Sequence, residues 1–269
     1  MGSLSSIKVS FALAWNAKVW LVSFWLIASL VVIVMLSAQF SGRQPAAVGL
    51  DVGISFIRIY MTVLIAMLSQ ELLSKEFERR YYLYSLSYPI SRDSMLLMRI
   101  ISIYLITLFV LTLSMIVLAS IASVVSLRYE QATPVSLGGH LLIVFSFLAV
   151  DLAVISAFSG LLAVVSKTPG FVLIGTLGFA ILARSYSSVL TLLGGDRIVV
   201  DDPERYQEVL SILSYVLPNL GLLDVRQVSL YSDLSFLPGN VLAVLVGPAI
   251  YLVLVILLAV WVFKKRRLN

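Results

Sequence analysis

The chain has 269 residues, of which 60% are apolar and only 12% are charged, and its mean hydropathy is +1.04. Soluble domains are about 45–50% apolar and roughly 25% charged, so this composition excludes an ordinary soluble globule and a polar, disordered chain. The formal net charge of +5 is modest. Cysteine is absent and histidine occurs once, which excludes disulfides, thiolate metal sites, cysteine nucleophiles and any catalytic site that needs two imidazoles.

Six apolar stretches are long enough to cross a bilayer, since a spanning helix needs about 20 apolar residues. They leave no room for a second soluble domain of ordinary size, about 100 residues. The sequence therefore predicts an all-α polytopic membrane protein whose residues 1–269 form one transmembrane domain. The six predicted spans are Val19–Leu36, Val52–Ser69, Ile100–Val125, Leu141–Val165, Phe171–Leu193 and Val241–Phe263.

The distribution of positive charge predicts the orientation of these spans. The chain ends with the run Lys264-Lys265-Arg266-Arg267 directly after the last span, and such runs stay in the cytoplasm. With six spans, both termini are then cytoplasmic. Of the 19 lysines and arginines, this topology places 12 inside and five outside, which supports the N-in, C-in orientation.

The first 18 residues are predicted to form an interfacial helix ahead of the first span. Phe11 and Trp15 lie between Lys8 and Lys18 at spacings that suit a helix. Such a segment lies along the cytoplasmic surface of the membrane.

The long cytoplasmic loop, residues 70–99, carries the most distinctive sequence pattern. It begins charged, becomes amphipathic, and is interrupted by Pro89, which ends a helix. Ser91 is a suitable cap for a new helix that starts near Arg92 and enters the third span. The pattern predicts a short helix at the cytoplasmic surface, a geometry that suits docking onto another protein.

Within this loop, Glu76-x-Glu78-Arg79 followed by Leu86-Ser-Tyr-Pro-Ile-Ser-Arg92 resembles the first cytoplasmic loop of ABC-2-type permeases, the membrane subunits of type V ABC exporters. The segment from Tyr215 to Arg226 looks like its counterpart in the multicopper-enzyme-maturation and nitrous oxide reductase maturation permeases. The chain departs from the family pattern where Arg80-Tyr81 replaces Gly-Thr and Met98-Arg99 replaces Gly-Lys.

The resemblance implies that the loop helix is a coupling helix that sits in a groove of a separate ATP-binding subunit. The alternative is a loop whose charges serve only solubility and orientation. None of the six lysines follows a glycine, so the chain lacks a Walker A phosphate-binding loop and is not expected to be an enzyme by itself. The residues expected at the ATPase-coupling interface are Glu71, Glu76, Glu78, Arg79, Arg80, Leu86, Pro89, Ser91 and Arg92.

The partners follow from the same resemblance. They are two copies of the ABC ATP-binding subunit, which would hold ATP and Mg²⁺, and a second copy of the permease in a homodimer. An extracytoplasmic protein is a further possible partner, and no feature indicates a nucleic acid. No cofactor or metal is expected on the chain itself.

Three ionisable residues, Arg58, Asp151 and Arg184, lie inside predicted spans. Such residues are costly in a bilayer and face a cavity or pair with each other. Their depths make an Asp151–Arg58 or Asp151–Arg184 ion pair feasible. The cluster has two interpretations: it lines a substrate path or locks a resting state, or it is a structural ion pair that fixes helix packing.

The last external loop, residues 194–240, is predicted to contain an amphipathic helix. Asp202 and Pro203 form a good helix start, and Pro218 stops the helix. In the family such helices form the external gate; docking of a partner and packing on the membrane surface are the other readings. The apolar stripe consists of Tyr206, Val209, Leu210, Leu213 and Val216.

The leading functional hypothesis is the permease subunit of an ATP-driven exporter in a bacterial or archaeal plasma membrane. The first alternative is a scaffold or mechanotransmission subunit that transports nothing. The second is an ion-coupled carrier, which rests on the charges within the spans. The pattern leaves the substrate and the direction of transport open.

Overall fold

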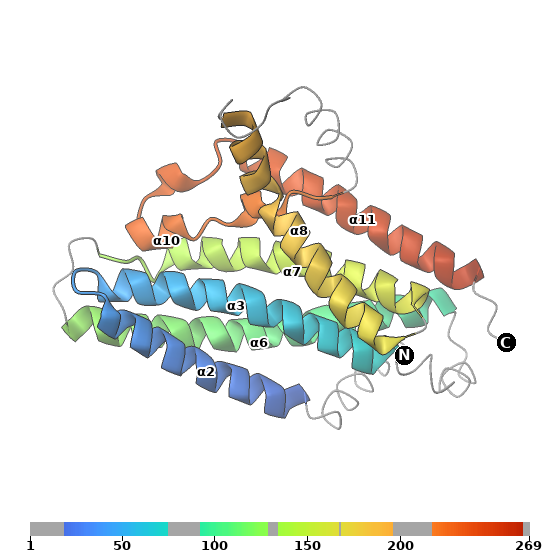
Figure 1. The fold of residues 1–269 in the computed structure, drawn as a ribbon, viewed down its shortest axis with the longest axis horizontal. Helices are drawn as coiled ribbons and strands as arrows, with labels where there is room; N and C mark the ends of the chain where they lie inside the picture. The colour runs from blue at the N-terminus through green and yellow to red at the C-terminus, as the bar shows by residue number, and fades with distance from the viewer. Residues whose placement is uncertain (1–18, 75–91, 129–133, 167, 196–216, 266–269) are drawn as a thin grey trace.

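The computed structural model describes residues 19–74, 92–128, 134–166, 168–195 and 217–265, and these residues form helices and connecting segments without any strand. Six long helices dominate (Figure 1). They are α2 (Val19–Phe40), α3 (Pro45–Ser69), α6 (Arg92–Arg128), α7 (Gly139–Val165), α8 (Pro169–Gly195) and α11 (Val241–Lys265).

All six helices are long and apolar enough to cross a membrane, which confirms the prediction of an all-helical, multi-pass membrane protein. α6 begins at Arg92, which confirms the predicted helix start near Arg92 ahead of the third span. α3 begins at Pro45, seven residues before the predicted span, because residues 46–50 are apolar or glycine and only Asp51 is charged. Proline fits the first turn of a helix, so Pro45 is a good starting point. α6 has 37 residues and is about 55 Å long, longer than the bilayer's apolar core of about 30 Å.

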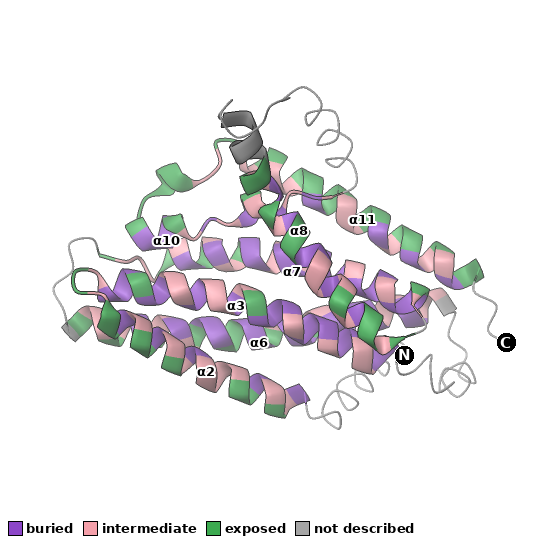
Figure 2. Ribbon diagram, in the orientation of Figure 1, coloured by how far each residue is buried: buried purple, intermediate pink, exposed green. Residues whose placement is uncertain are grey.

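α3 lies at the centre of the bundle and packs against α2, α6, α7 and α8 (Figure 1). Within the spanning windows, 61% of the residues of α3 are buried, against 22% for α2 and 11% for α11. The exposed residues of α2 and α11 are mostly large and apolar (Figure 2). These two helices are therefore peripheral and present their apolar surfaces to lipid, which suits a solvent of hydrocarbon chains.

Small residues allow the central helices to approach closely. A Cβ atom on Gly160 of α7 would lie 2.8 Å from Cγ1 of Ile100 on α6. A Cβ on Gly53 of α3 would lie 3.0 Å from Cγ2 of Val34 on α2. These glycines let helix backbones come together in a way that larger residues prevent.

Residues 217–240 return to the bundle as an irregular segment that contains η2 (Leu220–Leu223), α10 (Gln227–Tyr231) and η3 (Leu234–Phe236). We call the end of the bundle that holds this segment the loop face. Ser229 exchanges two hydrogen bonds with Ser136: its hydroxyl donates to the Ser136 carbonyl at 2.7 Å, and its own carbonyl accepts from the Ser136 amide at 3.0 Å. Leu220, Leu223 and Val228 are fully buried, so the segment is an integral part of the core.

Several predicted features lie outside the described residues. They are the interfacial helix at 1–18, the coupling helix within 75–91, and the amphipathic stripe of the external helix at 206–213. The side chains concerned are Glu76, Glu78, Arg79, Arg80, Leu86, Pro89, Ser91, Tyr206, Val209, Leu210 and Leu213. The N-in, C-in orientation stays a prediction.

Candidate functional site

The three ionisable residues predicted within the spans lie together in the structure. Asp151 of α7 accepts a hydrogen bond from Nη2 of Arg184 on α8 at 2.7 Å. The same carboxylate oxygen lies 3.7 Å from Nε of Arg58 on α3. Asp151 is completely buried, so the pairing meets the need of a buried carboxylate for a partner of opposite charge.

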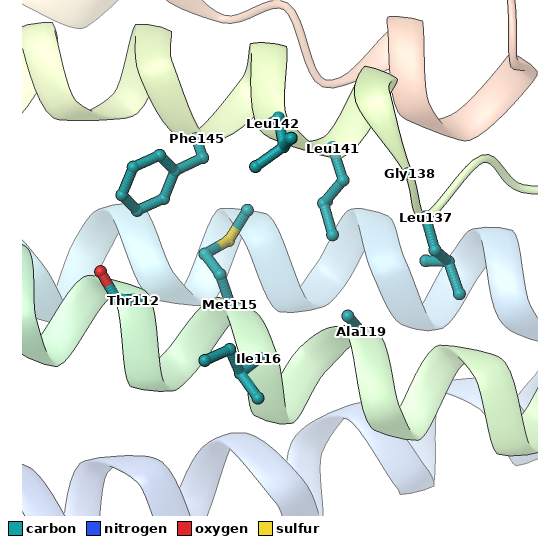
Figure 3. Close-up of a pocket in the computed structure, with 9 residues that line it drawn as sticks. All are labelled: Thr112, Met115, Ile116, Ala119, Leu137, Gly138, Leu141, Leu142 and Phe145. Carbon is teal, nitrogen blue, oxygen red and sulfur yellow. The ribbon is translucent and has the colours of Figure 1, made fainter.

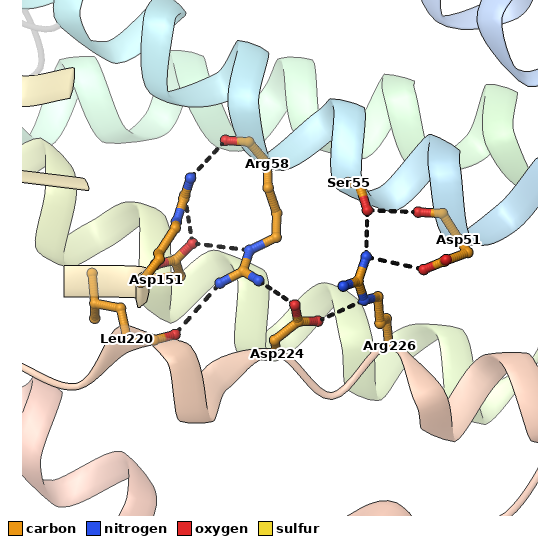
Figure 4. Close-up of polar contacts among 8 residues, drawn as sticks. Asp51, Ser55, Arg58, Asp151, Leu220, Asp224 and Arg226 are labelled. Atoms are coloured by element: carbon orange, nitrogen blue, oxygen red, sulfur yellow. Dashed lines mark hydrogen bonds and ion pairs between the residues drawn. The ribbon is translucent and has the colours of Figure 1, made fainter. Parts of the chain in front are cut away.

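The ion pairs continue beyond this triad toward the loop face (Figure 4). Arg58 donates to Asp224 at 2.5 Å. Asp224 in turn lies 3.4 Å from Nε of Arg226, whose Nη1 is 3.0 Å from Asp51 of α3. Arg226 also donates to the hydroxyl of Ser55. We call the resulting set the ionic network; it consists of Arg184, Asp151, Arg58, Asp224, Arg226 and Asp51.

The ionic network alternates in sign along its length. Its three arginines and three aspartates sum to zero charge. Side-chain exposure rises along it, from 0% at Asp151 and 11% at Arg58 to 47% at Asp51. Loss of one partner is costly where an ion pair is buried and costs little where water reaches it, so substitutions in the inner part of the network should be the most destabilising.

Backbone groups hold the network in place. The carbonyl of Arg58 accepts from Nη1 of Arg184 at 3.1 Å and from the hydroxyl of Thr62 at 2.9 Å. The carbonyl of Leu220 in η2 accepts from Nη2 of Arg58 at 3.4 Å. A Cβ on Gly221 would lie only 2.7 Å from the carbonyl oxygen of Arg184. The glycine therefore lets η2 lie directly against α8, which brings Asp224 within reach of Arg58.

Some hydrogen-bonding capacity at this site is not used by the described residues. Four buried side-chain atoms have no hydrogen-bond partner among the described residues. They are Oδ1 of Asp151, Nε of Arg58, Nε of Arg184 and Oδ1 of Asn219. Two of these atoms are donors and two are acceptors, so water or a small polar group matches both kinds.

The inner triad was predicted from the sequence, whereas the outer half of the network was not. Asp224 and Arg226 lie in the segment that resembles the maturation permeases, and Asp51 directly precedes the predicted second span. The alternation of sign was the available signal: Asp224 and Arg226 are two residues apart, and Asp51 and Arg58 are seven residues apart, close to two helical turns. The contact of Asp224 and Arg226 with Arg58 and Asp51 depends on the path of the irregular segment. That path has no sequence periodicity from which it could be predicted.

Three of the other predicted site residues lie within the described residues. Glu71 lies in η1 (Gln70–Ser74), a π-helical turn that continues α3. Arg92 is the first residue of α6, and Pro218 is buried just before η2. A π-helical turn is rare and frequently marks a functional position. Here it stands immediately ahead of the predicted coupling helix.

Comparison of the sequence with protein-family models finds no match, and a search of curated proteins finds no match either. Among the described residues, no group of three or more histidine, aspartate or glutamate side chains has an arrangement that could hold a metal ion. The loop motif and the ionic network are therefore the two features of the chain that bear on its function.

Proposed function

We propose that this chain is the membrane-spanning permease subunit of an ATP-driven ABC exporter in a bacterial or archaeal plasma membrane. A separate ATP-binding subunit, present in two copies, would hydrolyse ATP-Mg, and a second copy of this chain would complete the transmembrane unit. The loop motif from Glu76 to Arg92 supports the proposal, as do the six spanning helices and the lack of a Walker A sequence.

The observation that carries the proposal is one continuous helix, which joins the predicted coupling loop to the ionic network. α3 and η1 run without interruption from Pro45 to Ser74. This helix carries Asp51 and Arg58 of the network, and its last described residues, 70–74, are the first residues of the predicted coupling loop. Arg58 and Ser74 are 16 residues apart, or about 24 Å along a helix. A displacement of the loop by an ATPase would therefore reach the network through one rigid element.

The distribution of charge in the ionic network suits a loop-face segment that separates from the spanning helices. Asp224 and Arg226 belong to the loop-face segment and neutralise each other, whereas Asp51, Arg58, Asp151 and Arg184 belong to the spans and also sum to zero. Separation of the segment from the spans therefore leaves neither side with a net charge, which limits the electrostatic cost. We propose that this segment acts as the external gate and that the network holds it closed.

An ion-coupled carrier is the less favoured function. A carrier of cations needs a carboxylate that a cation can approach, but Asp151 lies between two guanidinium groups. A cation that approached this carboxylate would be repelled by both. A scaffold without transport uses the same network and coupling loop, and a flux measurement separates it from an exporter.

The first experiment is purification of the tagged protein from native membranes in mild detergent, with its partners identified by mass spectrometry. We expect a P-loop ATPase to copurify and to be lost in the double variant Glu78→Lys/Arg79→Glu. Arg43→Glu is the matched control, because Arg43 is an exposed residue in the α2–α3 turn, which the predicted topology places outside. Failure of any ATPase to copurify with the folded protein would refute the proposal.

The gate is tested with the reconstituted complex. Asp224→Asn removes the partner of Arg58 in the segment, whereas Asp233→Asn changes an exposed aspartate of the same segment that accepts hydrogen bonds from Ser235 and forms no ion pair among the described residues. We expect Asp224→Asn to raise the ATPase rate without substrate and to alter ATP-dependent flux, and Asp233→Asn to change neither. ATPase activity without flux in the unaltered complex would favour the scaffold.

A further inference from the structure

The last turn of α11 carries two neighbouring lysines, Lys264 and Lys265. α11 begins directly after the loop-face segment, so its last turn lies at the opposite end of the bundle (Figure 1). Both side chains are exposed, and no other lysine lies among the described residues. The predicted topology places this end in the cytoplasm. The two lysines therefore form an exposed cationic surface where α11 leaves the membrane.

A different contact holds each lysine in place. Nζ of Lys264 forms a 2.8 Å ion pair with Asp93 in the first turn of α6, and 60% of the lysine side chain stays exposed. Nζ of Lys265 lies 4.1 Å from the centre of the Trp261 ring, and no carboxylate among the described residues forms an ion pair with it. An ammonium group has three donor hydrogens, so both lysines keep donors for a further acceptor.

The charge of this surface does not cancel. Two positive lysines and the negative Asp93 leave a net charge of +1 on the described residues. Arg266 and Arg267 follow in the sequence and lie outside the described residues. The surface therefore attracts an anion rather than a neutral or zwitterionic group.

An exposed apolar stripe of α11 leads to Lys265. Its side chains follow the spacing i, i+4, i+7, i+8, i+11, which keeps them on one helix face, and Lys265 continues that face at i+15. The opposite face of α11, with Val255, Ala259 and Phe263, is buried against the bundle (Figure 2). We call the exposed face the α11 stripe; its residues, each 46–60% exposed, are Ile250, Leu254, Leu257, Leu258 and Trp261.

The order of side chains along the α11 stripe matches the order of chemical groups in one leaflet of a bilayer. Leu254 and Lys265 are 11 residues apart, or about 16 Å along a helix, and the hydrocarbon of one leaflet is about 15 Å thick. Tryptophan rings prefer the level of the headgroups, and the Lys265 ammonium lies over such a ring. Its charge therefore lies where lipid phosphates begin.

The apolar hollow between α6 and α7 lacks this combination (Figure 3). None of its nine lining residues is charged, so it has no means to distinguish one lipid headgroup from another. Selection by charge requires an apolar surface that ends in an unbalanced charge, as the α11 stripe does.

We propose that the end of α11 binds an anionic glycerophospholipid, with one acyl chain along the α11 stripe and the phosphate at Lys264 and Lys265. The net charge of +1 complements the single negative charge of phosphatidylglycerol, whereas the two lysines repel the cationic headgroup of a zwitterionic lipid. Anionic lipids are concentrated on the cytoplasmic side of membranes, where the predicted topology places this end. The site does not depend on the exporter function.

Trp261 itself reports the lipid beside it. Phenylalanine in place of Trp15, Trp20 and Trp25 leaves Trp261 as the sole tryptophan of the full-length chain. The protein is reconstituted in phosphatidylcholine vesicles that contain a minor fraction of brominated phosphatidylglycerol or brominated phosphatidylcholine, and the quenching of Trp261 fluorescence is measured. With bromine at the same acyl position in both lipids, depth cancels in the ratio of the two values. We expect quenching by the anionic lipid to be about fivefold stronger, the effect of one lysine near a membrane surface.

Two substitutions change the charge of the site in opposite directions. Lys265→Gln lowers it from +1 to zero and should reduce the quenching ratio severalfold, whereas Lys265→Arg should preserve the ratio. Asp93→Asn raises the charge from +1 to +2 and should increase the ratio. Arg43→Gln is the matched control, because Arg43 is an exposed basic residue in the α2–α3 turn at the other end of the bundle; it should leave the ratio unchanged.

The proposal fails if the ratio is close to one, if Lys265→Gln leaves it unchanged, or if Asp93→Asn lowers it. Loss of the excess on addition of soluble glycerol 3-phosphate would assign the site to a free anion and would also overturn it. If the variant with a single tryptophan does not fold, native mass spectrometry of the unaltered protein replaces fluorescence. It should then retain more phosphatidylglycerol than phosphatidylcholine from an equal mixture, and Lys265→Gln should remove that difference.

Discussion

Replacement of Asp151 by asparagine is the strongest test of the ionic network. The change preserves the size of the side chain, removes its charge and replaces one carboxylate oxygen by an amide NH2 group. It leaves Arg184 without an anionic partner, with the amide oxygen of the asparagine and the carbonyl of Arg58, at 3.1 Å, as neutral acceptors, whereas Arg58 keeps Asp224. Because Asp151 is completely buried, water cannot compensate for the lost charge.

The magnitude follows from this geometry. Removal of one partner from a buried ion pair costs about 3–5 kcal/mol. Both arginines retain another acceptor, so we expect the lower end, about 3 kcal/mol, which is roughly a hundredfold change in the ratio of folded to unfolded protein. For a chain of this size, this free energy corresponds to a fall in melting temperature of about 6–12 °C.

The assay is thermal unfolding of the detergent-solubilised protein, followed by tryptophan fluorescence, with Asp233→Asn as control. Asp233 is exposed, so its substitution should move the midpoint far less. Arg184→Met should be destabilising alone but should restore part of the stability when it is added to Asp151→Asn, because it removes a buried charge that has lost its partner. A midpoint for Asp151→Asn within 2 °C of that of Asp233→Asn would refute the reasoning, with about 2 °C being the least that 1 kcal/mol gives.

Three further substitutions probe the ionic network and one buried hydrogen bond between α3 and α6. Gly221→Ala places a methyl group 2.7 Å from the carbonyl of Arg184. We expect the free energy of unfolding to fall by about 1–3 kcal/mol and hydrogen exchange to become faster at residues 217–231. Unchanged exchange would contradict the close approach of η2 to α8. Asp51→Asn acts on the outermost ion pair, in which the Asp51 side chain is 47% exposed. Thermal unfolding should show a loss of less than about 1 kcal/mol in the free energy of unfolding. Tyr60→Phe removes the buried hydrogen bond between the hydroxyls of Tyr60 and Ser114; Ser114 keeps its bond to the Val110 carbonyl, so chemical denaturation should show a loss of about 1 kcal/mol.

The number and approximate positions of the helices were predictable because hydrophobic length is a strong signal in membrane proteins. A bilayer offers no partners for backbone groups, so a long apolar stretch has essentially one structure available to it. The ends of the helices were less predictable. The start of α6 at Arg92 was predicted from Pro89 and Ser91, whereas the start of α3 at Pro45 was not, because the charge of Asp51 marked the end of the apolar stretch and α3 continues through it. The π-helical turn at Gln70–Ser74 has no sequence signature at all.

The inner half of the ionic network was predictable, because Asp151 in a bilayer needs partners and two arginines were available at suitable depths. The outer half was not, because Asp224 and Arg226 lie in a segment without regular periodicity. The position of that segment depends on a single close approach at Gly221, a tertiary fact that local pattern does not contain. Asp51 looked like a residue at a membrane boundary because its partner is 175 residues away in the chain.

The gradient of burial along the network would allow one set of ion pairs both to hold the spanning helices together and to release the proposed gate. At its inner end, the fully buried Asp151 joins α3, α7 and α8, and the loss of one partner there costs several kcal/mol. At its outer end, Arg226 and Asp51 are a third and nearly half exposed, and such pairs contribute about 0–1 kcal/mol. The electrostatic cost of separation is therefore lowest at the outer end and rises at Arg58, which is paired with both halves. Movement of Arg58 away from Asp224 would break the inner ion pair between the segment and the spans. The segment would still be held by the buried Leu220, Leu223 and Val228, so the proposed gate opens only if these apolar contacts are broken as well.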